Sequence, residues 1–240
     1  MQFIVVDTAD SRGCVAIARE GAIVALEAHP AGEDYSTWLL PAAHRVMRSA
    51  GVALATLDGY AVCAGPGSFT GLRIGLTTVK AWSEIYGRPV AAVSRLEALA
   101  CDPGVDTGEW LATYYDAGRD QVFAALYRRV GGSWVRQSEE AVIGFDAFVS
   151  GARQAVAGSA ICWRTPDPEL MRMSRSWPGI EGRGDRIETI QPPFAESLAA
   201  VAARKLAAGE TTDAAALDAN YVRRSDAELF WKGNASAVKA

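Results

Sequence analysis

The segment whose residues could most readily bind a ligand or take part in a reaction is a glycine-rich turn. It runs from Gly65 to Gly75 and has the sequence GPGSFTGLRIG. An apolar run precedes it and a helical pattern follows, so Ser68 or Thr70 is placed to cap the helix. Glycine allows positive φ angles, and the free N–H groups of a helix N-terminus can bind an anion. Gly65, Gly67 and Ser68 therefore form either an anion site or a structural turn. The structural turn is favoured, because the Gly-Lys-Ser/Thr ending of a phosphate-binding loop is missing.

Two aspartates, Asp7 and Asp116, occupy matching places in the two halves of the chain. Each ends an apolar run and precedes a turn and a second apolar run, and VVDTA at 5–9 aligns with YYDAG at 114–118. This repeat indicates a duplicated architecture. It resembles the layout of actin-like ATPases, in which two such hairpins hold nucleotide phosphates and a magnesium ion. We predict a vestigial phosphate site, because Asp10 would repel phosphate, although each aspartate could instead bond its own turn.

The other reactive side chains are scattered. His29 and His44 are far apart, and neither has a second histidine, cysteine or paired carboxylate at metal-ligand spacing. The sequence contains no Gly-x-Ser-x-Gly nucleophile elbow, and Ser68 has no candidate base in its motif. The cysteines are widely spaced and form no CxxC pair: Cys14, Cys63, Cys101 and Cys162. We therefore predict no catalytic residue, no bound metal and no cofactor.

Composition and charge narrow the class of protein. The chain has 240 residues, of which 50% are hydrophobic and 22% charged, which is typical of a globular protein. Its net charge of −4 argues against independent binding to nucleic acid, and the five arginines at 160–190 are balanced by five carboxylates. No apolar run reaches the ~18 residues of a membrane-spanning helix, and no secretion signal is evident. We expect a soluble, cytoplasmic protein.

The elements that would position the turn and the aspartates alternate between strand and helix. This order predicts an α/β fold with two actin-like, ribonuclease H-like lobes, each a mixed sheet flanked by helices. The turn-rich segment 102–108 predicts a boundary between an N-terminal lobe, 1–101, and a smaller lobe, 102–240, whose last residues could return to the first. Strands are predicted at 3–6, 14–18, 22–26, 57–64, 90–93, 111–115 and 122–127, and helices at 36–50, which Pro41 starts or kinks, and at 70–86.

The glycine-rich turn also resembles the signature of the TsaB family, which is also called YeaZ, and its catalytic relative TsaD has a similar version. Residues 3–9, 116–123 and 220–224 resemble other landmarks of that family, whereas 128–190 are the least recognisable. One departure is clear. Family members commonly have a histidine just before the first helix, where this chain has GEDYS at 32–36, so no role of that histidine is carried over.

The resemblance implies a non-catalytic partner or activating subunit of a TsaD-containing complex that forms threonylcarbamoyl-adenosine next to the anticodon of tRNA. It implies a heterodimer with a TsaD-like subunit, a TsaE-like ATPase as a further partner, contact with tRNA only through the complex, and no membrane. A homodimer of the chain alone remains open. The alternative function is an active small-molecule kinase or ATPase of the actin-like fold, for which Asp7 and Asp116 are the only support.

The helix predicted at 70–86 is apolar on nearly all sides, so one face should pack on the sheet and another should meet a partner. Small residues recur along it at helical spacing and would let another helix come close. The residues assigned to this partner surface are Gly71, Leu72, Gly75, Thr78, Val79 and Trp82. If the assignment holds, Gly75→Arg should abolish partner binding and leave the melting of the isolated chain unchanged. Burial within the same chain is the alternative.

Overall fold

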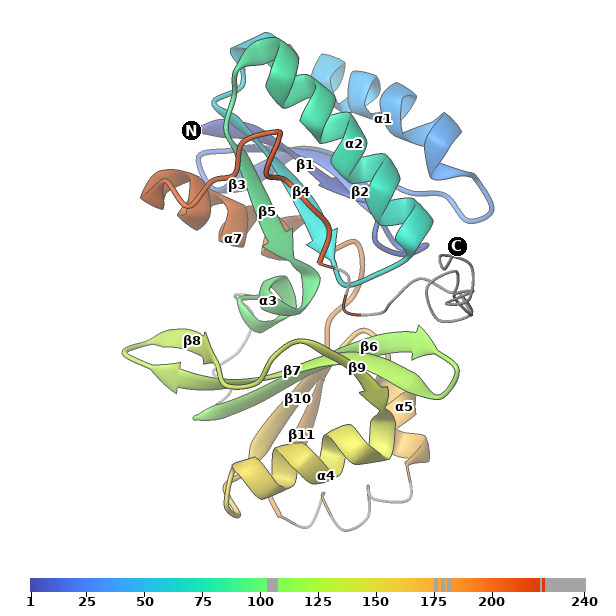
Figure 1. Ribbon diagram of the computed structural model, residues 1–240, viewed down its shortest axis with the longest axis vertical. Helices are drawn as coiled ribbons and strands as arrows, with labels where there is room; N and C mark the ends of the chain where they lie inside the picture. The colour runs from blue at the N-terminus through green and yellow to red at the C-terminus, as the bar shows by residue number, and fades with distance from the viewer. Residues whose placement is uncertain (103–107, 175–176, 178–179, 181–182, 221, 223–240) are drawn as a thin grey trace, which may run out of the picture.

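A computed structural model of the chain describes residues 1–102, 108–174, 177, 180, 183–220 and 222. It contains two β-sheets, one above the other in Figure 1, with a short helix, α3, between them. Both sheets combine parallel and antiparallel strand pairs and both are flanked by helices. The predicted α/β class with two mixed sheets is therefore confirmed.

The first sheet has the strand order β3-β2-β1-β4-β5. Its strands are β1 (Gln2–Asp7), β2 (Cys14–Arg19), β3 (Ala22–Ala28), β4 (Gly59–Gly65) and β5 (Val90–Ser94). Helices α1 (Tyr35–Ala50) and α2 (Phe69–Tyr86) cover one face, α7 (Ala195–Ala208) covers the other, and the 3-10 turn Leu54–Thr56 leads into β4. The central strands are buried on both faces, which explains why they appear in the sequence as continuous apolar runs.

The second sheet has the order β11-β10-β6-β7-β8, and β9 also pairs with β7. Its strands are β6 (Trp110–Gly118), β7 (Gln121–Val130), β8 (Ser133–Arg136), β9 (Ala141–Gly144), β10 (Ile161–Thr165) and β11 (Arg186–Thr189). Helix α4 (Phe145–Ala155) packs against β7 and β9, and α5 (Pro168–Met173) contacts β11. The side of the sheet that faces α3 (Arg95–Ala100) shares one apolar core with the first lobe through Tyr115, Phe123 and Tyr127.

Local signals account for most element ends. Gly51 and Gly87 end α1 and α2 in the left-handed conformation, with φ of 68° and 62°. Pro41 lies inside α1, well after its first residue, Tyr35, so it does not start the helix. Asp34 occupies the N-cap position of α1 without a side-chain hydrogen bond.

The two hairpins that the sequence aligns differ in their turns. Residues 8–13 connect β1 to β2, and Asp7 forms the last strand pair, with Cys14. In the second lobe, Asp116 pairs with Val122 inside the ladder, and only Arg119 and Asp120, both in the left-handed region, separate β6 from β7. The duplication therefore preserves the strand pairing but not the turn.

The predicted lobe boundary falls mainly on residues 103–107, outside the described residues, so the division at residue 101 stays a prediction. Helix α7 follows the second sheet in sequence and packs against strands of the first. Within the described part of the chain, none of the helices combines the length and the apolar character that crossing a membrane requires.

Candidate functional site

The carboxylate of Asp7, at the end of β1, is fully buried and is engaged by its own lobe. Its Oδ1 accepts a hydrogen bond from the backbone N–H of Ala9 at 3.0 Å. Nη2 of Arg95, the first residue of α3, lies 2.7 Å from both carboxylate oxygens. Arg95 is also fully buried. Asp7 is thus paired with a buried cation and with its own turn, and it presents no free oxygen to a ligand.

Asp10 is the second carboxylate that Arg95 contacts, with Nη1 at 2.6 Å from Oδ2. Arg12 approaches the same carboxylate with Nε at 3.0 Å, Nη2 at 2.7 Å and its backbone N–H at 2.8 Å. Burial alone would raise the pKa of Asp10, but the charges of Arg95 and Arg12 outweigh it and hold the pKa well below its usual range. The negative charge of Asp10, which we expected to repel phosphate, is therefore neutralised by arginines of the same chain.

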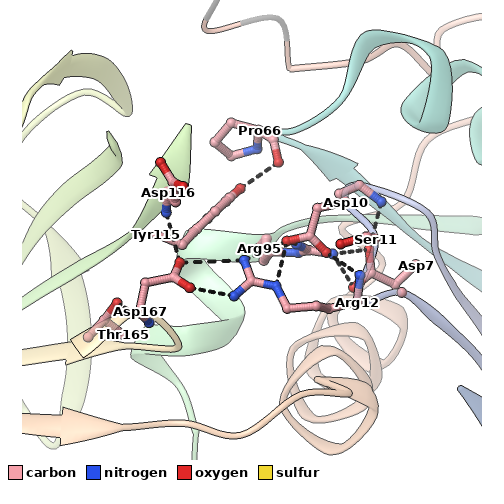
Figure 2. A network of polar contacts seen from close by, with 12 residues as sticks. Asp7, Asp10, Ser11, Arg12, Pro66, Arg95, Tyr115, Asp116, Thr165 and Asp167 are labelled. Carbon is pink, nitrogen blue, oxygen red and sulfur yellow. Dashed lines mark hydrogen bonds and ion pairs between the residues drawn. The ribbon is translucent and has the colours of Figure 1, made fainter. Parts of the chain in front are cut away.

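Arg12 continues the network into the second lobe. Its Nη1 donates to Oδ1 of Asp167 at 2.6 Å, and Oδ2 of Asp167 accepts the backbone N–H of Asp116 at 2.8 Å. The carboxylate of Asp116 is exposed, and it bonds the N–H of Gly118 in its own turn at 2.7 Å. Figure 2 shows Asp7 and Asp116 at opposite ends of this network, with arginines between them.

The alternative interpretation of each aspartate, as a residue that bonds its own turn, therefore describes an observed contact in both lobes. Sequence reasoning did not find Arg95, Arg12 or Asp167. A signal for Arg95 was available, because Ser94 to Glu97 is a Ser-x-x-Glu helix start and the Ser94 hydroxyl accepts the Glu97 N–H at 3.3 Å. An arginine at this otherwise apolar junction of strand and helix needs a buried acid. No local pattern connects Arg12 to Asp167, which are 155 positions apart.

The glycine-rich turn contacts the same β1–β2 turn from the other side. The N–H of Ser68 donates to the carbonyl of Ala9 at 2.6 Å, and the Thr8 hydroxyl donates to the carbonyl of Gly71 at 2.7 Å. A Cβ on Gly67 would lie 2.4 Å from the Ala9 carbonyl oxygen. The glycine is thus required for close approach between two backbones.

The start of α2 uses its own N–H groups internally as well. The hydroxyl of Ser68, the N-cap residue, accepts the N–H of Gly71 at 3.3 Å, as predicted for a cap. Gly65 has a φ of 114°, which only glycine adopts readily. These contacts support the structural-turn interpretation of Gly65, Gly67 and Ser68 over an anion site.

The small-residue stripe on α2 does not face outward, which corrects the sequence-based assignment of the partner surface. A Cβ on Gly71 would meet the Thr8 carbonyl oxygen at 2.1 Å, and one on Gly75 would meet the Thr8 hydroxyl at 2.4 Å. Leu72, Val79 and Trp82 are buried in the first lobe, and Thr78 is half-buried. Gly71 and Gly75 face Thr8 of the β1–β2 turn, which leaves no room for a Cβ at either position. The exposed residues of its outer face include Arg73, Thr77, Ala81 and Ile85.

Neither histidine belongs to a metal site in the described part of the chain, where no group of three or more His, Cys, Asp or Glu side chains could hold an ion. His29 stacks on Tyr35 with ring centroids 3.9 Å apart and meets Trp38 edge-on at 4.9 Å. His44 is exposed on α1. The Tyr35 hydroxyl donates to the Asp10 carbonyl and accepts the Gly13 N–H at 3.0 Å, so this aromatic cluster supports the β1–β2 turn.

A hollow of about 690 Å³ lies beside Asp116. Its lining comes entirely from the second lobe, from the β6–β7 turn and the neighbouring parts of α4 and α5. No residue of the β1–β2 turn contributes to it. The hollow is therefore not a cleft shared between the two carboxylates that the sequence paired.

The two-lobed arrangement defines the class of protein. Over 86% of its length, the chain is similar to the complete ROK hexokinase of Thermus thermophilus, with a TM-score of 0.51 and 13% identity. This likeness shows the actin-like fold alone. The similarity to YeaZ of Pseudomonas aeruginosa is greater, with a TM-score of 0.68, 28% identity and coverage of 90% of this chain and 98% of that one.

The particular family follows from the sequence comparisons. The family described as TsaD, tRNA N6-adenosine threonylcarbamoyltransferase, matches residues 28–227. The TsaB protein of Bacillus subtilis is 32% identical over 132 residues, and that of Escherichia coli is 26% identical over 97% of both chains. The chain belongs to the TsaD family and, within it, to the TsaB group that is also called YeaZ. The match spans only 57% of the B. subtilis relative.

Proposed function

We propose that this chain is a non-catalytic partner subunit of a TsaD-containing complex that forms threonylcarbamoyl-adenosine next to the anticodon of tRNA. Relatives named for the biosynthesis of this nucleoside support the pathway. The proposal includes a TsaE-like ATPase as a further partner, contact with tRNA only through the complex, and a cytoplasmic location. It leaves open whether the chain forms a homodimer when alone.

The observation that carries the non-catalytic part is the pairing of Asp7 with Arg95. A carboxylate that binds a magnesium–nucleotide complex must offer an oxygen to the metal or to its waters. Both oxygens of Asp7 lie 2.7 Å from Nη2 of Arg95 in a fully buried pair. If Asp7 moved away from Arg95 to bind a metal, the buried Arg95 charge would keep only Asp10 as a counter-charge, and this would cost free energy. We infer that Asp7 and Asp116 are remnants of a phosphate site. The kinase or ATPase alternative requires both aspartates to act on one nucleotide, and we infer that they do not.

The outer faces of α1 and α2 support the partner part of the proposal. Leu40 of α1 is 57% exposed and Ile85 of α2 is 71% exposed, and the two helices pack side by side over the first sheet (Figure 1). A partner that covers this outer face would remove the apolar surface of both side chains from water. We infer that a TsaD-like subunit covers this outer face and not the buried glycine stripe.

Co-purification tests the proposal. The tagged chain is co-expressed with the TsaD-like protein of the same organism, and recovery of that protein is compared for the wild type, Leu40→Glu, Ile85→Glu and a control, Val130→Glu. Val130 is 53% exposed in the second lobe, so it matches the other two in chemistry but not in place. We expect recovery with the wild type and the control and at least a tenfold loss with either helix variant, since an uncompensated charge in an interface costs ~1.4 kcal/mol or more.

Two results would sink the proposal. One is a wild-type chain that retains no more TsaD-like protein than bare resin. The other is calorimetric binding of ATP by the isolated chain at micromolar affinity that Asp7→Ala abolishes, which would favour the kinase or ATPase alternative. Equal loss of recovery in the Val130→Glu control would reject only the assignment of the surface to α1 and α2.

A further inference from the structure

Arg12 is the residue through which the β1–β2 turn contacts the second lobe, and the turn around it is fixed at several points. Its Ala9 carbonyl accepts from Ser68, its Asp10 carbonyl accepts from Tyr35, and the Asp10 carboxylate contacts Arg95. The Arg12 guanidinium is then oriented by two nitrogens on the Asp10 carboxylate. A long side chain that is normally flexible is thus held in one direction by its own lobe.

The acceptor in the second lobe is fixed as well. Asp167 follows β10 and precedes α5, and its backbone N–H donates to the Thr165 hydroxyl at 2.9 Å. Its carboxylate accepts the Asp116 N–H from β6 and Nη1 of Arg12. The side chains of Arg12, Asp10 and Asp167 are only 26%, 23% and 22% exposed. Partial burial reduces the solvent screening that weakens ion pairs on an open surface.

We propose that Arg12, held between Asp10 and Asp167, is a latch that fixes the orientation of the two lobes without a bound ligand (Figure 2). The second sheet also contacts α3, where Nη1 of Arg164 donates to the carbonyls of Leu99 and Ala100 at 2.9 and 3.0 Å. Glu140 of the second lobe also accepts from the hydroxyl of Ser94, the N-cap residue of α3, and from the side chain of Asn220, and a junction held at these points leaves the two sheets some freedom to tilt. The latch adds an attachment at a different element, the β1–β2 turn, and removes that freedom.

A further contact near the latch acts in the same direction. The hydroxyl of Tyr115 donates to the carbonyl of Pro66, in the glycine-rich turn. This contact is uncharged, whereas Arg12 is the donor of the ion pair that joins Asp10 to Asp167. We therefore assign the main restraint at this edge to Arg12. The latch is a property of the isolated chain and does not depend on the proposed partner.

The distance between two spin labels, one on each lobe, tests the latch directly. Thr77 of α2 and Ser150 of α4 are exposed and serve as cysteine positions in a Cys101→Ala background, since the other native cysteines are buried. We expect a narrow distance distribution in the wild type, and a shifted or broadened one in both Arg12→Met and Asp167→Asn. The double variant should be no broader than either single variant, because each removes the same link.

Arg45→Met is the matched control, because Arg45 pairs with Glu27 inside the first lobe, with Nε at 2.8 Å from the carboxylate. It should leave the distance distribution unchanged. Asp167→Asn keeps the shape and an acceptor for the Asp116 N–H, so it carries the test alone if Arg12→Met fails to fold. A wild-type distribution in Asp167→Asn, or equal broadening in Arg45→Met, would overturn the proposal.

Discussion

Replacing Gly75 by alanine tests the packing of α2 most directly. The structure predicts a loss of stability, whereas helix propensity alone predicts a gain. An added Cβ would lie 2.4 Å from the Thr8 hydroxyl, whereas real Cβ contacts do not fall below 3.0 Å. Thr8 is fully buried, and its hydroxyl donates to the Gly71 carbonyl at 2.7 Å. Rotating the hydroxyl away would break that hydrogen bond, so the clash has no easy relief.

The magnitude follows from three contributions. Overpacking of a close contact costs about 1–3 kcal/mol. Loss of the buried hydrogen bond costs about 1 kcal/mol more. Alanine gains about 1 kcal/mol over glycine in a helix, so the net loss of stability is roughly 1–3 kcal/mol. For a chain of this size, that corresponds to a melting temperature lower by about 2–12 °C.

Thermal and urea unfolding followed by circular dichroism measures the effect in the isolated chain. Gly151→Ala is the matched control, because Gly151 lies inside α4 and a Cβ there would meet nothing within 4 Å. It should raise stability by up to about 1 kcal/mol. If Gly75→Ala is as stable as Gly151→Ala, the helix does not pack on Thr8 and the correction to the partner surface is wrong.

Two further predictions concern buried ionisable groups. Arg95→Met should lower stability at pH 7 by about 3–5 kcal/mol, because it leaves two carboxylates with too little positive charge. In the wild type the pKa of Asp10 is lowered by its arginines, so stability is present above the unfolded value and is lost as pH falls. The deficit of Arg95→Met in urea unfolding should therefore stay nearly constant from pH 7 to pH 5 and shrink as pH falls below the unfolded pKa of about 3.9, toward pH 3. A deficit that is still unchanged at pH 3 would contradict this account. Burial raises the pKa of Cys63, and that of Cys162 to about 11, so both thiols should resist iodoacetamide at pH 8 in the native chain while the half-buried Cys101 reacts first. Mass spectrometry of the labelled chain checks this, and early labelling of Cys63 would refute the burial argument.

Local signals in the sequence were sufficient for most of the first lobe. The predicted strand at 3–6 lies inside β1, and the helix predicted at 70–86 begins one residue earlier, at Phe69. Ser68 was identified as a candidate cap because capping depends on residues three apart. The central strands were found because burial on both faces makes continuous apolar runs.

The network at the junction could not be predicted, because its partners are distant in sequence. Asp7 and Arg95 are 88 positions apart, and Arg12 and Asp167 are 155 apart. An acidic residue in a turn looks the same in sequence whether it faces a ligand or a buried arginine. The orientation of α2 was missed for a related reason: a helix that is apolar on all sides does not show which face meets the sheet.

The glycine-rich turn and Asp7 were the two features that suggested ligand chemistry. In the structure, both form contacts within the chain itself. The β1–β2 turn lies between them, with Thr8 and Ala9 bonded to the glycine-rich turn and the α2 start, and Asp7 bonded to Arg95. Glycines that would let a backbone approach a phosphate let it approach another backbone here. A motif of this kind therefore identifies a fold and a place of close contact. Whether the contact is a ligand or the chain itself depends on a distant residue, which in this chain is Arg95.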